Sequence, residues 1–73
     1  MTNTIEIYVE LLDEGTPTIR PTQAEDMGNG LFKILPTPDY DPEDEKWEFL
    51  PGSIVRCEKR SDVKESYLVA IAA

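Results

Sequence analysis

The sequence has no histidine and only one cysteine, and each scarcity excludes a class of site. Without histidine, the common catalytic triads and general bases are missing, and a zinc site lacks its usual ligands. Cys57 has no partner for a disulfide within the chain, which is typical of a protein from a reducing compartment. We therefore expect a cytoplasmic protein that is not an enzyme and has no catalytic, metal or cofactor site.

Positive charge is also scarce, because Lys and Arg total 7 against 15 Asp and Glu, giving a formal net charge of −8. Nucleic-acid binding depends largely on neutralising phosphates with basic side chains, so an acidic surface disfavours it. Basic residues do cluster within residues 56–64, but acidic residues interleave with them. We expect no direct contact with nucleic acid, and we expect a protein partner to offer a basic face.

Long apolar runs are absent as well. No run approaches the roughly 18 residues of a membrane span, and residues 1–5 have neither the basic segment nor the apolar run of a signal peptide. The length of 73 residues suits one small domain over 1–73 with a single core. We expect one domain of modest stability that does not enter a membrane.

What the sequence does contain is a series of short strand patterns, beginning with strict alternation of apolar and polar residues over 4–12. Pro21 lacks an N–H group, so the second strand is an edge strand or is bent there. Asn29-Gly30 suits a type I′ hairpin turn, and Pro51-Gly52 suits a type II turn. The expected strands are 4–12, 18–27, 31–35, 53–58 and 66–72. Five short strands without a long helix predict an all-β fold, a small barrel or sandwich.

The densest chemical segment is PDYDPEDEKWEF, residues 38–49, which combines acidic and aromatic side chains with two prolines. It begins like an EF-hand calcium loop, but Asp44 replaces the required glycine and Leu50 replaces the closing Glu. Its carboxylates also lie on a loop of a chain too small for a deep catalytic cleft. We therefore expect only weak binding of hard cations there and no catalysis.

Local sequence explains this segment better as a turn that presents acids. Asp41 suits the capping position of a helical turn, and Pro42 suits its first position. The acids that follow favour the positive end of a helix dipole. We expect a short helical or 3₁₀ turn over 42–47 within the connection 37–50.

Two interpretations of the aromatic residues remain open. In the first, Trp47 and Phe49 complete the core and the acids form a solvated face, because so small a chain needs large apolar side chains in its core. In the second, Tyr40 and part of Trp47 also stay exposed beside the acids, which makes a contact patch.

Several segments together resemble a family of short uncharacterised bacterial proteins. They are LLDEGT (11–16), RP (20–21), a G-x-G hairpin and DPEDEKWEFLPGSIVRCE (41–58), within a resemblance that covers about residues 5–58. Members often carry an aromatic residue before the Arg-Pro pair, where this chain has Ile19. The resemblance implies a small five-stranded barrel of the Src-homology-3-like (SH3-like) kind in a bacterial cytoplasm, and no known activity. Ligands of such barrels commonly meet loops that correspond here to 13–18 and 38–49.

The function that these features favour is a non-enzymatic binding or regulatory module that contacts another protein through an acidic-aromatic loop surface. The alternative is an acidic antagonist that occupies the surface of a basic nucleic-acid-binding protein or neutralises a basic toxin. We expect eight residues to supply the charge and the anchors: Asp13, Glu14, Tyr40, Asp41, Glu43, Asp44, Glu45 and Trp47.

Overall fold

The computed structural model describes residues 3–61 and 63–73, and every regular element within these ranges is a strand. The strands are β1 (Thr4–Leu12), β2 (Ile19–Gly28), β3 (Leu31–Ile34), β4 (Lys46–Trp47), β5 (Ile54–Ser61) and β6 (Ser66–Ile71). The prediction of an all-β fold is confirmed. No helix that could cross a membrane occurs in these ranges.

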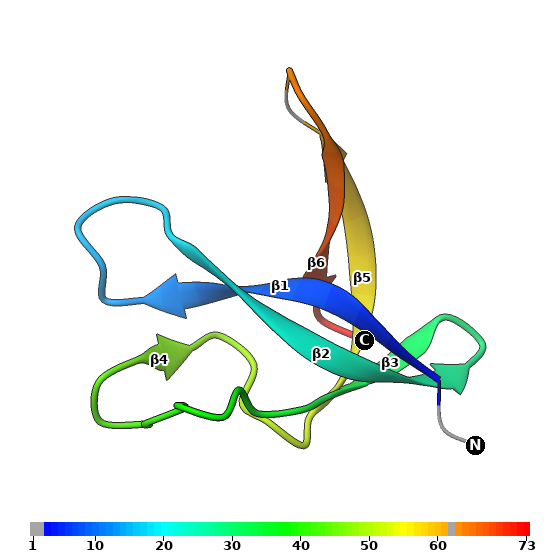
Figure 1. Cartoon of the computed structure of the whole chain (residues 1–73), viewed down its shortest axis with the longest axis horizontal. Helices are drawn as coiled ribbons and strands as arrows, with labels where there is room; N and C mark the ends of the chain where they lie inside the picture. The colour runs from blue at the N-terminus through cyan, green and yellow to red at the C-terminus, as the bar shows by residue number, and fades with distance from the viewer. Residues whose placement is uncertain (1–2, 62) are drawn as a thin grey trace.

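Five of the strands form a closed ring. Antiparallel pairs join β1 to β2, β2 to β3, β3 to β5 and β5 to β6, and a parallel bridge between Tyr8 and Val69 returns from β6 to β1. The β5–β6 hairpin rises away from the crossed strands β1 and β2 (Figure 1). Because each strand of the ring has two neighbours, closure reduces the exposed edges that endanger a small all-β chain.

Two turns have the backbone that their residues predict. Asn29 and Gly30 join β2 to β3 with φ values of 57° and 77°, the positive sign that a type I′ turn requires at both positions. A second turn is closed by the bond from Ser53 N to Leu50 O at 3.0 Å, and its Gly52 has φ 93°. That glycine occupies the position at which a type II turn needs positive φ.

The core lies inside the ring and takes alternate residues from the strands. Its buried members are Ile7, Val9, Ala24, Ile34, Trp47, Val55 and Ala70. Cys57 packs half-buried against this cluster, on the face of β5 that also carries Val55, as its position in the strand predicts. Removal of these apolar surfaces from water, at about 25 cal/mol per Å², supplies most of the stability of the fold.

The connection 37–50 contains a hydrogen-bonded turn where we predicted a helical one. Residues 42–44 form this turn, closed by bonds from Asp44 N and Glu45 N to Asp41 O at 3.1 and 3.0 Å. No helix follows, because the next residues enter a strand and their backbone groups pair with β1 instead of continuing the turn.

That strand, β4, raises the number of strands to six where five were predicted. It pairs with the end of β1 in the register Leu11↔Trp47 and Leu12↔Lys46. A strand of two residues has no periodicity to detect, and a distant partner determines it rather than local propensity. The strand β5 also runs to Ser61, three residues beyond its predicted end, because β6 pairs with it that far.

Candidate functional site

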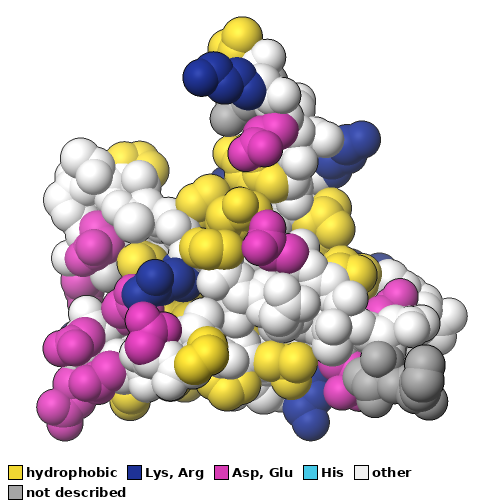
Figure 2. Space-filling model, in the orientation of Figure 1, with side chains coloured by type: hydrophobic (Ala, Val, Ile, Leu, Met, Phe, Trp, Pro, Cys, Tyr) yellow, Lys and Arg dark blue, Asp and Glu magenta, His cyan; other side chains and the backbone are white. Residues whose placement is uncertain are grey.

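Two acidic loops that are distant in sequence lie side by side. Because β4 pairs with the end of β1, the loop after β1 (13–18) runs beside the loop before β4 (38–45). An ion pair of 3.5 Å between Lys46 Nζ and Asp13 Oδ2 links the first loop to β4, directly after the second loop. Figure 2 shows acidic side chains gathered at this end of the molecule. The fold therefore brings together the two loops that the sequence resemblance indicates.

We use the name acidic surface for five of the exposed carboxylates of these loops: Asp13, Glu14, Asp41, Glu43 and Asp44. Within the described part of the chain, the side chains of Glu14, Glu43 and Asp44 take part in no hydrogen bond or ion pair. Their charge is thus left for solvent or for a partner.

Asp41 shapes the loop that presents two of these acids. Its Oδ1 accepts a hydrogen bond from the backbone N–H of Glu43 at 2.9 Å, the geometry of an Asx turn. Its backbone carbonyl also accepts the bonds that close the turn. The prediction that Asp41 caps a turn is confirmed, and Glu43 and Asp44 are presented on hydrogen-bonded backbone.

Glu45 does not belong to the presented charge, because it holds the loop against the ring. Its carboxylate forms a two-point ion pair with Arg20, in which Nε donates to Oε1 at 3.1 Å and Nη2 donates to Oε2. Oε1 also accepts a hydrogen bond from Nε1–H of Trp47 at 3.2 Å. These bonds, chiefly the one from Arg20, hold the pKa of Glu45 below its usual range. The side chain is 19% exposed.

Trp47 and Tyr40 form the apolar support under the same loop. Trp47 is 2% exposed and belongs to the core, with Phe49 packed half-buried against that core. The Tyr40 ring meets the Trp47 ring edge-on at a centroid distance of 4.8 Å. Trp47 therefore has almost no area to offer a partner, whereas half-buried Tyr40 keeps part of its surface exposed.

Sequence reasoning missed the contribution of Arg20. The ladder places Arg20 opposite Val9, and its guanidinium reaches Glu45, 25 positions further along the chain. No local sequence pattern predicts an ion pair between residues so far apart in the chain. A basic side chain in a partly buried strand of an acidic protein was the available signal, since such a charge needs a partner.

Two kinds of site can be checked among the described residues: a metal site and an activated cysteine. In these ranges, no three His, Cys, Asp or Glu side chains converge so as to hold a metal ion. Burial raises the pKa of the Cys57 thiol, which is the opposite of what an activated nucleophile needs. The arrangement is instead suited to presenting negative charge in a defined geometry.

Comparison with known proteins gave no match: no protein-family model, no curated protein and no solved structure is significantly similar to the chain. Inference about its function therefore depends on the geometry of the acidic surface and the residues that support it.

Proposed function

We propose that the protein is a non-enzymatic binding module whose acidic surface contacts a protein partner with a basic face. One observation carries the proposal: Glu14, Glu43 and Asp44 are exposed and lack intramolecular partners among the described residues, on two loops that the fold joins. Because Glu45 and Trp47 hold the loop in place, binding costs less ordering entropy than it would on a mobile loop.

The charge of the whole chain agrees with this role. Complementary charge steers association and sets the orientation of two surfaces. With a net charge of −8, the molecule attracts a basic face at long range and repels nucleic acid. The same attraction is screened over about 8–10 Å at ordinary salt, so the association is expected to be sensitive to salt.

The fold and the setting that the sequence resemblance implies belong to the same proposal. The small closed ring of strands is compatible with an SH3-like barrel, and the single free thiol is compatible with a bacterial cytoplasm. Ligands of such barrels meet the loops that here carry the acidic surface. Comparison of the strand order and closure of the ring with those of SH3-like barrels tests the fold, and fractionation of the native cell tests the location.

The test of function is capture of the partner from a lysate of the native cell, with two charge-matched variants. The first replaces Glu14, Glu43 and Asp44 by Lys, and the second makes the same change at three acids outside the acidic surface, Asp26, Glu58 and Glu65. Replacing one acid by Lys raises the net charge by two units, so the three replacements in each variant change it from −8 to −2.

We expect wild type and the second variant to capture the same partner, and the first variant to lose it. Equal capture by all three proteins would mean that the acidic surface is only a solvated face. If the partner binds nucleic acid or is a toxin, competition by nucleic acid or relief of toxicity distinguishes the antagonist role from a general binding role.

A further inference from the structure

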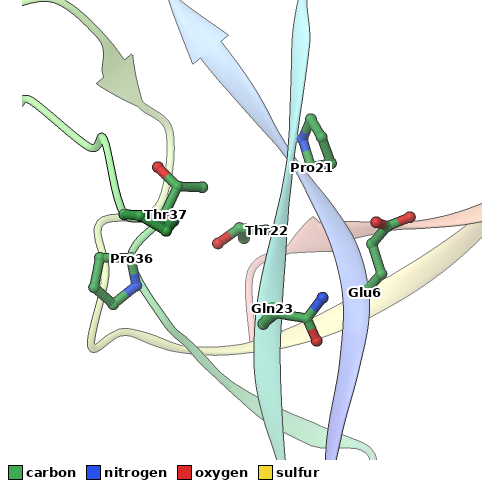
Figure 3. A pocket seen from close by; sticks show the side chains of 7 residues that line it. Glu6, Pro21, Thr22, Gln23, Pro36 and Thr37 are labelled. Carbon is green, nitrogen blue, oxygen red and sulfur yellow. The ribbon is translucent and has the colours of Figure 1, made fainter.

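A pocket of about 240 Å³ opens beside β2, where the chain after β3 separates from it. Three prolines line it: Pro21 on β2, and Pro36 and Pro38 on the segment that leads into the acidic loop. Figure 3 shows Pro36 and Thr37 on one side of Thr22, and Pro21, Gln23 and Glu6 on the other.

The prolines account for the pocket. The pairing of β2 with β3 ends at Ala24↔Ile34 and one further bond, from Leu35 N to Gln23 O at 2.9 Å. Beyond that point, Pro21 has no N–H to donate toward the segment after β3, and the ring of Pro36 restricts the backbone of that segment, so the ladder ends and the two segments part. Because a proline ring fixes φ, the walls are formed before any ligand arrives.

One wall also contains an unsatisfied polar group. The Thr37 hydroxyl oxygen is buried and has no hydrogen-bond partner among the described residues, whereas the Thr22 hydroxyl donates to Leu35 O. A buried hydroxyl without a partner costs stability, and such groups in folded proteins call for an explanation.

The volume of the pocket and the side chains at its edge together indicate what kind of group it can hold. The pocket is smaller than the roughly 300–1,000 Å³ of typical small-molecule sites, so a single side chain suits it better than a whole ligand. Glu6 and Gln23, which face each other across β1 and β2, supply a carboxylate and an amide at the edge. An apolar interior with a carboxylate at its edge is complementary to an apolar side chain that has a basic neighbour.

We propose that this pocket receives an apolar side chain of about leucine size from an extended basic segment of the partner protein. The Lys or Arg residues on either side of that apolar residue lie toward Glu6 in one direction and toward the loop 38–45 in the other. This inference rests on the proposed function, because it assigns to the same partner an anchor that the acidic surface alone does not provide.

The test uses capped peptides as probes and follows the backbone amide signals of the labelled protein by nuclear magnetic resonance. Lys-Arg-Leu-Arg-Lys is compared with Lys-Arg-Ser-Arg-Lys, which keeps the charge and loses the anchor. We expect the leucine peptide to shift the signals of Gln23 and Thr37 and to bind about tenfold more tightly, as one buried aliphatic group allows.

Two protein variants complete the test. Gln23→Phe places an aromatic ring at the pocket, where a strand position tolerates it, and it should abolish the preference for leucine. Ser66→Phe, an equally exposed strand position outside the pocket lining, should leave the preference intact. Equal binding of the two peptides to wild type, or leucine-dependent shifts elsewhere in the protein, would overturn the inference.

The same titrations distinguish failure of the pocket inference from failure of the proposed function. If leucine is preferred but replacing Glu14, Glu43 and Asp44 by Lys changes nothing, the pocket stands and the proposed function fails. If the Lys variant loses affinity for both peptides while leucine gives no advantage, the proposed function stands and the pocket inference is wrong.

Discussion

At the scale of single residues, the two threonines that line the pocket differ in hydrogen bonding. Thr22 Oγ1 donates to a backbone carbonyl, whereas Thr37 Oγ1 has no partner among the described residues. We predict that Thr37→Val raises the free energy of unfolding by about 1 kcal/mol, because it removes an unsatisfied hydroxyl and keeps the shape. Thr22→Val should lower it by a similar amount, because a carbonyl loses its donor.

Urea unfolding followed by the fluorescence of Trp47, the single tryptophan, measures both effects. A destabilised Thr37→Val would show that the hydroxyl finds a partner in solution. In that case, the unsatisfied group would no longer support the assignment of the pocket.

The ion pair of Glu45 predicts how the stability of the protein depends on pH. Its pKa in the folded protein lies below its usual range because of the bond from Arg20, so its contribution to stability is fully present above the unfolded-state value of about 4.3 and is lost as the pH falls further. Glu45→Gln should therefore destabilise the protein at pH 7, by about 1–3 kcal/mol. The difference from wild type should shrink below pH 4.

Unfolding by urea between pH 3 and pH 7 tests the prediction, with exposed Glu43→Gln as the control that changes little at any pH. An unchanged difference between wild type and Glu45→Gln at pH 3 and pH 7 would show that packing, rather than the ion pair with Arg20, is what the substitution disturbs.

At the scale of elements, Trp47 lies beneath the loop over residues 38–45 and is bonded to it. Trp47 fills the core beneath the loop and donates a hydrogen bond to Glu45. Trp47→Phe loses that bond and part of the ring, so we predict a loss of about 1–3 kcal/mol in the free energy of unfolding. If the substitution speeds amide exchange, relative to wild type, more in 38–45 than in β1, the loop loosens first.

The control for this prediction is Tyr40→Phe, which keeps the edge-on ring contact with Trp47 and removes only a hydroxyl. It should leave amide exchange in the loop almost unchanged. Equal exchange across the chain in Trp47→Phe would mean that the ring supports the whole core and has no special relation to the loop.

The elements also show where sequence reasoning succeeds. The strand over 4–12 and the turn at Asn29-Gly30 were predictable, because neighbouring residue types alone indicate the alternation of the strand and the positive φ of the turn. β4 and the bond between Arg20 and Glu45 were not, because each exists only through a partner distant in sequence. The acidic loop could thus be identified from sequence, but the inward direction of Glu45 could not.

Two further long-range contacts join the β5–β6 hairpin to β1. The rings of Tyr8 and Tyr67 meet edge-on at 5.3 Å, and Arg60 Nη2 approaches Glu10 Oε2 at 3.6 Å. Both contacts lie on the face of β1 opposite to Ile7 and Val9 of the core. The face of β1 opposite the core therefore also makes contacts within the fold, although the alternation of its sequence suggests one buried and one solvated face.

At the scale of the whole molecule, charge is distributed unevenly. The loop over residues 38–45 carries acids with Lys46 as its nearest basic neighbour in sequence, whereas four of the 7 basic residues lie within 56–64. A basic partner is therefore attracted toward the end of the molecule that carries the acidic surface. Because this attraction acts between solvated charges, it should weaken as salt shortens its range.

We predict that the affinity for the peptide Lys-Arg-Leu-Arg-Lys falls at least several-fold between 50 and 300 mM NaCl. Calorimetric titration at four salt concentrations measures this decrease. The variant with Lys at 14, 43 and 44 should bind weakly at low salt and show a much flatter dependence, because the opposing charges are gone. The variant with Lys at 26, 58 and 65 has the same net charge and should retain the steep dependence. If the two variants respond to salt alike, net charge alone drives the binding, and the geometry of the acidic surface contributes no specificity.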